Sequence, residues 1–448
     1  MASRWPRIGS LYLARWLSAL TSACLLLQAA GALAQAPQGP MPRAVAPPQL
    51  QAREVALEEA IAIALATEPN IQARLYDYEA ARYRVNQALA PILPQLSGTW
   101  TASRQGAPLT GIAAQSVTRT TTTAQVTLSQ ILFDFGKTFA AANVERANRE
   151  MARLDAETQK DQVVLAVKES YFTLLFAKRL VAVNQAALER AQLNLKSAKG
   201  FFEVGTRPKS DVTRVEVDVA NARVDLIRAR NGVSLARVAL NTAMGIAVDT
   251  PTEVKDILTF EPYPVEQDRL LAEALRQRPE YLRVNALVSG AEAGVRRASR
   301  DFFPDVSGFS SYGATTTDFR ETWELGVSLS WSFFDGGNRL ARRQETRKSL
   351  DAARARLQAL ELSIWQEAVQ AHLNLQEAQE RIGAAQKAVE SAQENFRLAQ
   401  GRFDAGVGTI LELTDAQLAL TQAQATEAQA LADYRIAIAR VERALGRR

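Results

Sequence analysis

The sequence predicts an α+β fold in which one arrangement of strands and long helices occurs twice. Three observations carry this prediction. A segment ending in LFDFGK at Lys137 recurs 201 residues later, two stretches of about 63 residues lack proline and are nearly free of glycine, and residues 323–333 alternate strictly between apolar and small or polar side chains. The first observation indicates a tandem duplication, the second indicates long helices, and the third indicates a strand with one apolar face.

The N-terminal segment predicts export. Residues 1–34 carry three arginines and no acidic residue, and a short apolar stretch leads to the small-x-small triplet Ala32-Leu33-Ala34. This pattern is typical of a cleaved secretory signal peptide, so we expect cleavage before Gln35 and a proline-rich linker over 35–54. An N-terminal membrane anchor is the alternative, but the apolar stretch is short for a hydrocarbon core of about 30 Å.

Composition argues against several classes of protein. Loss of the signal peptide lowers the formal net charge from +5 to +2, and no run of lysine and arginine is present, so we expect no nucleic-acid partner. The single cysteine, Cys24, lies within the signal peptide. The single histidine, His372, lies inside a long helix, and no Gly-x-Ser-x-Gly motif occurs. We therefore expect no catalytic site, no metal site and no cofactor.

The register of the duplication sets the domain boundaries. At an offset of 201 residues, LSQILFDFGK at 128–137 aligns with LSWSFFDGGN at 329–338, and the alignment continues without a gap to the end of each half. Upstream of these segments the offset is 210, so the nine-residue difference falls in a loop. We expect a first repeat over 55–245, a linker over 246–268 and a second repeat over 269–446. Each repeat should contain a helix, two strands, a long helix, a turn and a final helix.

Each repeat is expected to end in a pair of helices. The long members cover 137–200 and 338–400, and the shorter members cover 208–244 and 410–445. A straight helix of about 63 residues measures about 95 Å. Large apolar residues alternate with alanine on a 3.5-residue period, which predicts coiled-coil packing. A solid antiparallel coiled coil would explain the helices alone equally well.

Four segments are expected to be strands, near 96–103, 122–133, 305–312 and 323–334. The last is the clearest, and its length suits a tilted membrane strand of about 9–11 residues with lipid on one face and water on the other. Because about eight strands are the minimum for a closed barrel, four strands per chain imply an oligomer. A dimer would supply eight strands and a trimer twelve.

In the order of its elements and in the motifs FDFGK, FFDGGN, FEVGTRPKSDV and FDAGVGTILELTDA, the chain resembles the TolC family of outer-membrane efflux and secretion channels. The resemblance covers about residues 55–446. It implies a homotrimer whose twelve-stranded β-barrel lies among the lipids of the outer membrane of a Gram-negative bacterium. A barrel of coiled-coil helices would continue it through the periplasm, and the 246–268 linker would belong to a smaller equatorial region.

The resemblance also implies a function. The trimer would be a passive exit duct of a tripartite efflux pump or a type I secretion system. Its partners would be a periplasmic adaptor protein and an inner-membrane pump of the RND or ABC type. The resemblance does not specify whether the cargo is a drug, a metal ion, a siderophore or a protein toxin. The alternative is a periplasmic coiled-coil adaptor or spacer, which would explain the helices and the signal peptide but not two duplicated strand pairs.

Two acidic residues are candidates for a pore constriction. Glu412 and Asp415 lie one turn apart and share one helix face, and Asp211 and Arg214 occupy the matching positions of the first repeat. The resemblance implies that Glu412 and Asp415 line the narrowed periplasmic mouth, where a trimer would bring six carboxylates together and favour cations. The alternative is an exposed pair that stabilises the helix N-terminus through its dipole.

The resemblance raises one question about how the mouth is held shut. Some relatives carry arginine where Gly408 stands and tyrosine where Phe403 stands, and they use both side chains in polar links at the tip. Neither hydrogen-bonding group is available in this chain. We expect a weaker latch, or one built from Asp211 and Arg214.

The two turns between the paired helices are candidates for adaptor contact, which the resemblance implies. They contain Gly205, Thr206, Arg207 and Pro208 in the first repeat, and Gly406, Val407, Gly408 and Thr409 in the second. Local structure alone would also account for these residues, because glycine ends a helix and proline begins one. Arg207 and Lys209 add positive charge in the first turn only.

The segment ILFDFGKT at 131–138 contains fragments of two nucleotide-binding motifs, but its context favours a strand-to-helix junction. A phosphate-binding loop would require glycine at position 131, and a kinase would require an upstream histidine. The second copy, SFFDGGNR, keeps only Phe, Asp and Gly. The residues expected to end the strands, cap the helices and allow the turn are Phe133, Asp134, Gly136, Phe334, Asp335 and Gly337.

Overall fold

The computed structural model describes residues 54–108, 116–264, 267–315 and 320–448. The signal peptide predicted over 1–34, and the linker predicted over 35–54 up to its last residue, lie outside the described residues. Among the described helices, none is both long enough and apolar enough to cross a membrane.

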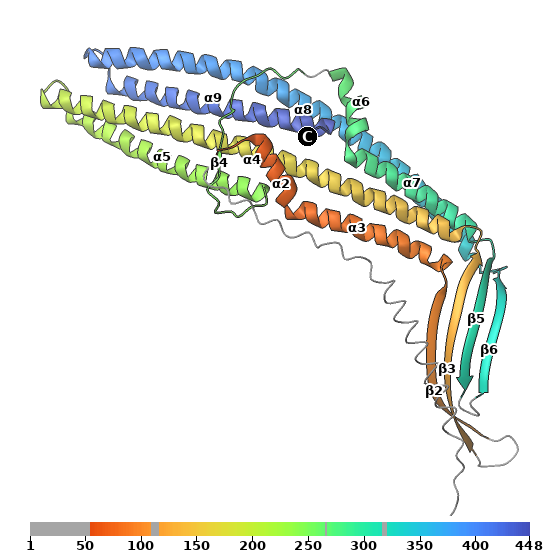
Figure 1. The fold of residues 1–448 in the computed structure, drawn as a ribbon. Coiled ribbons are helices and arrows are strands. Elements are labelled where there is room, and N and C mark those ends of the chain that lie inside the picture. Colours follow the sequence, from red (N-terminus) through yellow and green to blue (C-terminus); the bar gives the residue numbers. More distant parts are fainter. Residues whose placement is uncertain (1–53, 109–115, 265–266, 316–319) are drawn as a thin grey trace, which may run out of the picture. The chain divides into compact units, whose positions relative to one another are not determined.

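The two repeats contain closely matching elements in the same order (Figure 1). The first repeat comprises β1 (Glu54–Val55), α2 (Leu57–Thr67), α3 (Pro69–Leu89), η1 (Ala90–Ile92), β2 (Gln95–Pro108), β3 (Ser116–Phe133), α4 (Lys137–Glu203) and α5 (Lys209–Ala243). The second comprises β4 (Glu253–Val254), α6 (Gln267–Gln277), α7 (Pro279–Arg300), β5 (Asp305–Thr315), β6 (Arg320–Ser330), α8 (Asn338–Asp404) and α9 (Ile410–Leu445).

Two helices precede the long strands in each repeat, whereas the sequence predicts one. The break falls at Glu68 in the first repeat and at Arg278 in the second, and both residues have extended backbone. Proline follows each of them, at Pro69 and Pro279, and disfavours helical backbone at the residue before it. The two helices of each repeat therefore meet at a proline.

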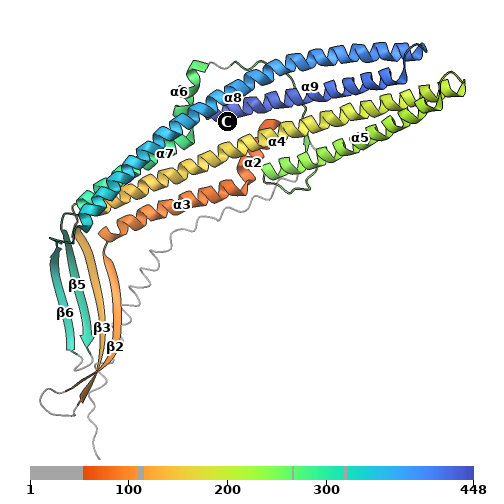
Figure 2. The same ribbon diagram turned by 180° about the vertical axis from the view of Figure 1, so that it is seen from behind.

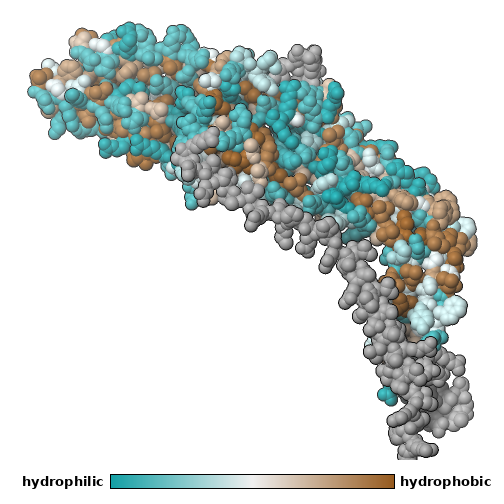
Figure 3. All heavy atoms as spheres, in the orientation of Figure 1, coloured by the Kyte–Doolittle hydropathy of each residue, from teal (hydrophilic) through white to brown (hydrophobic). Residues whose placement is uncertain are grey.

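The four long strands form one antiparallel sheet in the order β2-β3-β5-β6 (Figures 1 and 2). Leu96 lies opposite Leu128, Val126 opposite Tyr312, and Tyr312 opposite Trp323, so one face of the sheet is lined with exposed apolar side chains across all four strands. Apolar residues also gather around the strands in the space-filling view (Figure 3). The opposite face carries mainly serine, threonine and glutamine.

Strand β6 is shorter at its end than the alternation in the sequence indicates. It ends at Ser330, so Phe334 lies four residues beyond the strand rather than at its last position. The reason is the partner strand, which begins at Asp305, directly after Pro304, and pairs that residue with Ser330. Phe133, in contrast, is the last residue of β3.

The long helices α4 and α8 contain 67 residues each and pack along α5 and α9 in two helical hairpins. Towards the strands, α4 also packs against α3 and α7, and α8 packs against α7. Tyr171 of α4 is fully buried, and its hydroxyl lies 3.1 Å from the carbonyl oxygen of Val55 and 2.8 Å from that of Lys255. This contact fixes the small parallel pair β1–β4 against α4.

The turns that end α5 and α9 lie against the proline breaks of their own repeats. Gly245 has a φ of +68°, and a Cβ atom there would lie 2.8 Å from the Cα atom of Glu68. Gly446 has a φ of +77°, and its Cβ would lie 3.0 Å from the backbone nitrogen of Arg278. Neither position has room for a side chain, so both repeats close at the same point by backbone contact.

We expect Gly245→Ala to destabilise the protein more than Gly205→Ala. Both glycines have left-handed backbone, with φ of +68° and +75°, but nothing lies within 4 Å of a Cβ built at Gly205. The backbone conformation alone should cost about 1 kcal/mol in each variant. Overpacking against Glu68 should add about 1–3 kcal/mol in Gly245→Ala only. Thermal unfolding of the purified protein in detergent measures the difference, and equal shifts would contradict the close approach.

Candidate functional site

The candidate site lies at the tips of the two helical hairpins, where both turns have the same backbone structure. Gly205 and Gly406 have φ of +75° and +78°. The amide of Thr206 donates to the carbonyl of Phe201 at 2.9 Å, and the amide of Val407 donates to that of Arg402 at 3.0 Å. These are Schellman motifs, which satisfy the last carbonyl groups of α4 and α8. The glycines therefore end the helices in both repeats.

The helices restart differently in the two repeats. Thr409 precedes α9 and its hydroxyl accepts a hydrogen bond from the amide of Glu412 at 3.2 Å. Pro208 precedes α5 and provides no side-chain cap. The missing cap in the first repeat follows from the residue type, because proline has no side-chain acceptor.

The two hairpins share a hydrophobic core beside their turns. It is formed by buried residues of all four helices: Ala198, Val212, Val215, Ala399, Phe403, Ile410, Leu413 and Ala416. Phe403 is fully buried, and its ring meets that of Phe201 edge to face, with 5.6 Å between the ring centroids. Within one chain, the tips of the first and second repeats are therefore packed together.

Arg207 joins the two turns across this core. Its side chain is only 14% exposed, and its guanidinium donates to the carbonyl oxygen of Gly408 at 2.5 Å. The guanidinium carbon lies 4.5 Å from the centroid of the Phe403 ring, and one nitrogen lies 3.7 Å from a carboxylate oxygen of Asp211. Hydrogen bonding, cation–π contact and ion pairing thus hold one side chain between the two repeats.

Gly408 is the residue that makes room for this contact. It is buried, and a Cβ atom at this position would lie 2.9 Å from the Cβ of Arg402 and 2.9 Å from the backbone nitrogen of Phe403. Gly408 thus contributes its backbone carbonyl oxygen to the site. Arg207 and Gly408 are equivalent positions of the duplication, at the offset of 201 residues.

The candidate constriction residues lie close to the turns. Glu412 is about half exposed, with a carboxylate oxygen 3.8 Å from the Nε of Arg402, and Asp415 is exposed one turn further along α9. A single chain thus presents two carboxylates on one side of α9 near the tip. Nothing in the chain neutralises Asp415 by an ion pair within the described residues.

Asp218 is a further acidic residue of this region, which the sequence analysis did not find. One of its carboxylate oxygens is buried and has no hydrogen-bond partner in the part of the chain that the structure describes. Burial raises the pKa of Asp218, the positive charge of Arg214 opposes this, and the negative charge of Asp415 adds to it. Asp218 and Asp415 come from different repeats, so only the fold reveals that they are neighbours.

Asp211 and Arg214, the residues of the alternative latch, form no ion pair with each other within the described residues. Asp211 faces Arg207, which lies four residues before it in the turn that precedes α5. Arg214 is exposed, and its charge acts on Asp218, one turn after it. The sequence predicts that Arg207 is a charge on the surface of the first turn, whereas the structure places it between the hairpins.

The strand-to-helix junctions are built around Asp134 and Asp335. Asp134 accepts hydrogen bonds from the amides of Gly136 at 2.8 Å and Thr138 at 2.7 Å, and Asp335 accepts from those of Gly337 at 3.2 Å and Arg339 at 3.0 Å. Burial alone would raise the pKa of Asp134, but these hydrogen bonds and Lys137 lower it overall. Gly136 and Gly337 both have left-handed backbone, with φ of +78° and +87°.

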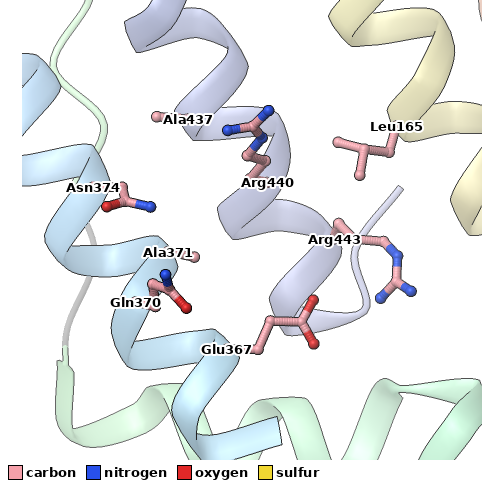
Figure 4. Close-up of a pocket in the computed structure, with 8 residues that line it drawn as sticks. All are labelled: Leu165, Glu367, Gln370, Ala371, Asn374, Ala437, Arg440 and Arg443. Atoms are coloured by element: carbon pink, nitrogen blue, oxygen red, sulfur yellow. The ribbon is translucent and has the colours of Figure 1, made fainter. Parts of the chain in front are cut away.

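A cavity of about 280 Å³ lies between α4, α8 and α9 (Figure 4). Its lining residues are Leu165, Glu367, Gln370, Ala371, Asn374, Ala437, Arg440 and Arg443. Each charged side chain in the lining already has an ion-pair partner: Glu367–Arg278 at 2.7 Å, Arg440–Glu169 at 2.8 Å and Arg443–Glu280 at 2.7 Å. We therefore interpret the cavity as part of the network that ties α8 and α9 to α4 and α7.

No group of three or more His, Cys, Asp or Glu side chains suited to a metal ion occurs among the described residues. His372 is buried on α8, beside the apolar cluster that contains Ala368 and Leu375. This environment is that of a packing residue.

The fold defines the class of protein. The structure matches that of the outer-membrane channel OprN with a TM-score of 0.76 at 21% identity, over 87% of this chain and 89% of that one. It matches the Campylobacter jejuni CmeC outer membrane channel with a TM-score of 0.77 at 16% identity, over 87% and 85%. The chain has the fold of an outer-membrane channel protein.

The chain belongs to the outer membrane efflux protein family, whose model matches residues 60–246 and 270–447. It is 24% identical over 339 residues to outer membrane protein TolC of Escherichia coli, covering 71% of this chain and 67% of that protein. It is 23% identical over 306 residues to the alkaline protease secretion protein AprF of Pseudomonas aeruginosa, covering 62% and 61%. The protein is therefore an efflux or secretion channel of the outer membrane that extends into the periplasm.

Proposed function

We propose that three copies of this chain form one continuous exit duct, with a twelve-stranded barrel in the outer membrane and a barrel of helices in the periplasm. The single observation that carries the proposal is the sheet. Its apolar face is exposed on all four strands, and its outer strands β2 and β6 each pair on one side only within the described residues. In lipid such edges must be paired, and other copies of the same sheet can pair them.

The duct is passive in this proposal. An inner-membrane pump of the RND or ABC type supplies the energy, and a periplasmic adaptor protein connects the pump to the hairpin tips. AprF is by name a secretion protein, and the family is by name one of efflux proteins, so both kinds of transport have a precedent among the relatives. The turns at 204–208 and 405–409 are the surface for the adaptor, because Val204 and Val407 are more than 70% exposed there.

Cysteine cross-linking tests the closure of the barrel. Thr99 on β2 and Ser328 on β6 lie on the non-apolar face of the sheet. We expect Thr99→Cys, combined in turn with Ser328→Cys, Gly326→Cys or Glu324→Cys, to give an oxidised covalent trimer in at least one register. Non-reducing gel electrophoresis of outer-membrane fractions detects it.

The control uses a central strand. Thr127→Cys on β3 with Ser328→Cys should give no covalent trimer, because β5 separates these strands within the sheet. Monomers alone across the whole β2–β6 set would contradict closure of the barrel by β2 and β6.

The acidic residues near the tip form the constriction in this proposal. A trimer would bring three copies of Glu412 and Asp415 around its axis, and close carboxylates attract divalent cations. We expect Glu412→Gln with Asp415→Asn to raise by at least about tenfold the divalent-cation concentration that half-blocks the channel in planar bilayers.

The matched control is Glu203→Gln with Asp404→Asn, which removes two exposed carboxylates from the ends of α4 and α8. Block of this variant should equal that of the wild type. An unchanged block in the Glu412 and Asp415 variant would refute the constriction.

Arg207 holds the mouth closed in this proposal, in place of the Asp211–Arg214 latch expected from the sequence. We expect Arg207→Ala to increase the conductance of the closed channel in bilayers, because it removes the hydrogen bond to Gly408 and the contact with Phe403. Asp211→Ala should have a smaller effect, since it removes only a contact at 3.7 Å.

Two exposed residues of α5 serve as controls. Lys209→Ala and Arg214→Ala remove positive charge near the same turn without breaking a contact between the hairpins. Conductance in both should stay at the wild-type value. If Arg207→Ala conducts no better than Lys209→Ala, then Arg207 does not hold the mouth closed.

A further inference from the structure

We propose that basic side chains near the sheet-proximal ends of the helices bind anionic phospholipid headgroups on the periplasmic side of the outer membrane. We call this set the basic collar. Its members are Arg82 on α3, Arg149 on α4, Arg296 and Arg297 on α7, and Arg342 and Arg347 on α8. The proposal goes beyond the exit-duct function and rests on the location of the protein in the outer membrane.

Topology brings the six residues to the part of the helices next to the sheet. Because the sheet is antiparallel, α3 and α7 lead into it, and α4 and α8 leave it, at the same edge. At a rise of 1.5 Å per residue, Arg297 lies about 5 Å from the last residue of α7, and Arg347 lies about 14 Å from the first residue of α8. The same count places Arg82 about 10 Å from the end of α3 and Arg149 about 18 Å from the first residue of α4, so the collar extends over several helical turns.

The collar carries charge that the protein does not use. Within the described residues, no ion pair includes any of its six members, and five of the six are exposed. Three nearby acidic residues pair with other basic residues, Asp335 with Arg339, Glu292 with Arg354 and Asp305 with Lys137. The helices adjoining the sheet thus present unpaired guanidinium groups to their surroundings.

Exposed aromatic residues mark the level of the membrane surface next to the collar. Phe333 and Phe334 are 83% and 87% exposed in the segment between β6 and α8, and Trp331 beside them donates to the carbonyl of Phe302 at 3.2 Å. Aromatic side chains of this kind sit at the boundary between hydrocarbon and headgroups. The headgroup layer, about 5–8 Å deep, then begins where the helices begin.

A small cavity shows what the collar can bind. It measures about 210 Å³, lies between α3 and α4, and is lined by Arg82, Tyr83, Val85, Asn86 and Arg149. Two guanidiniums, a phenol and an amide line the cavity, and guanidinium groups bind phosphate oxygens in pairs. A phospholipid phosphate has the negative charge that this lining lacks and the acceptor atoms that its guanidinium groups need.

Charge and distance favour a lipid surface as the partner. Basic residues close to an anionic membrane surface each contribute about fivefold to binding, and the effect decays within a screening length of about 8 Å. Long arginine side chains can extend from the first turns of the helices towards such a surface. The collar would then hold the channel at a fixed depth in the membrane.

Quenching of tryptophan fluorescence by brominated lipids tests the proposal on the trimer in vesicles, with residues 1–34 and their Trp5 and Trp16 removed. Trp100→Phe, Trp323→Phe and Trp365→Phe then leave Trp331 as the reporter at the collar, and a second protein keeps only Trp323 near the other end of β6. We expect Trp331 to report a several-fold preference for brominated phosphatidylglycerol over brominated phosphatidylcholine, and Trp323 to report none.

Substitution within the collar should weaken this preference. In the Trp331 protein, Arg82→Gln, Arg342→Gln and Arg347→Gln together should lower the ratio clearly below that of the unsubstituted Trp331 protein. The control removes three exposed basic residues of α4 and α5, by Lys196→Gln, Lys209→Gln and Arg223→Gln, and should keep the wild-type ratio.

A salt titration tests the proposal if the collar variant does not assemble. In the otherwise unchanged Trp331 protein, 1 M salt shortens the screening length to about 3 Å and should abolish the preference. An anionic preference that survives both the substitutions and salt would overturn the proposal. A collar variant that alters the ion selectivity of the pore but leaves the ratio of phosphatidylglycerol to phosphatidylcholine quenching unchanged would also overturn the proposal. Its arginines would then face the channel.

Discussion

Hydrogen bonding at the edges of the four-stranded sheet constrains the rest of the molecule. Strands β2 and β6 have one partner each among the described residues, and the face they share with β3 and β5 is apolar and exposed. A backbone group without a partner in lipid costs several kcal/mol, so both edges of the sheet need further partners in a membrane. The helices that adjoin the sheet must leave both edges free for such partners. Helices α4 and α8, 67 residues each, extend about 100 Å from the sheet.

The duplication accounts for the matching elements of the two repeats, and residues that differ between the repeats form the contacts at the tip. Both turns end in the same Schellman motif, yet only the first has an arginine that reaches the other. Because Arg207 and the core around Phe403 join both hairpins of one chain, the tip of a single copy is one packed unit. Separation of the two tips within one copy therefore requires loss of the Arg207 contact and of the shared core.

Features with a local cause could be predicted from the sequence, and features that depend on distant partners could not. The apolar face of β6 follows from a period of two, and the caps at Asp134 and Asp335 follow from residues at most four positions away. The end of β6 at Ser330 depends on where its partner begins after Pro304. The interactions of Arg207 with Gly408 and of Asp218 with Asp415 join residues about two hundred positions apart, so no local pattern shows them. The break at Pro69 was missed, although it could have been predicted because proline restricts the residue before it.

The geometry of Gly408 limits which sequences are reachable by single substitutions. Any side chain there would meet the backbone of Phe403, so an arginine cannot simply move from the first turn to the second. An arginine could take the place of Gly408 only after the backbone of the second turn had changed. Two copies of one ancestral hairpin have in this respect become different parts, which are no longer interchangeable.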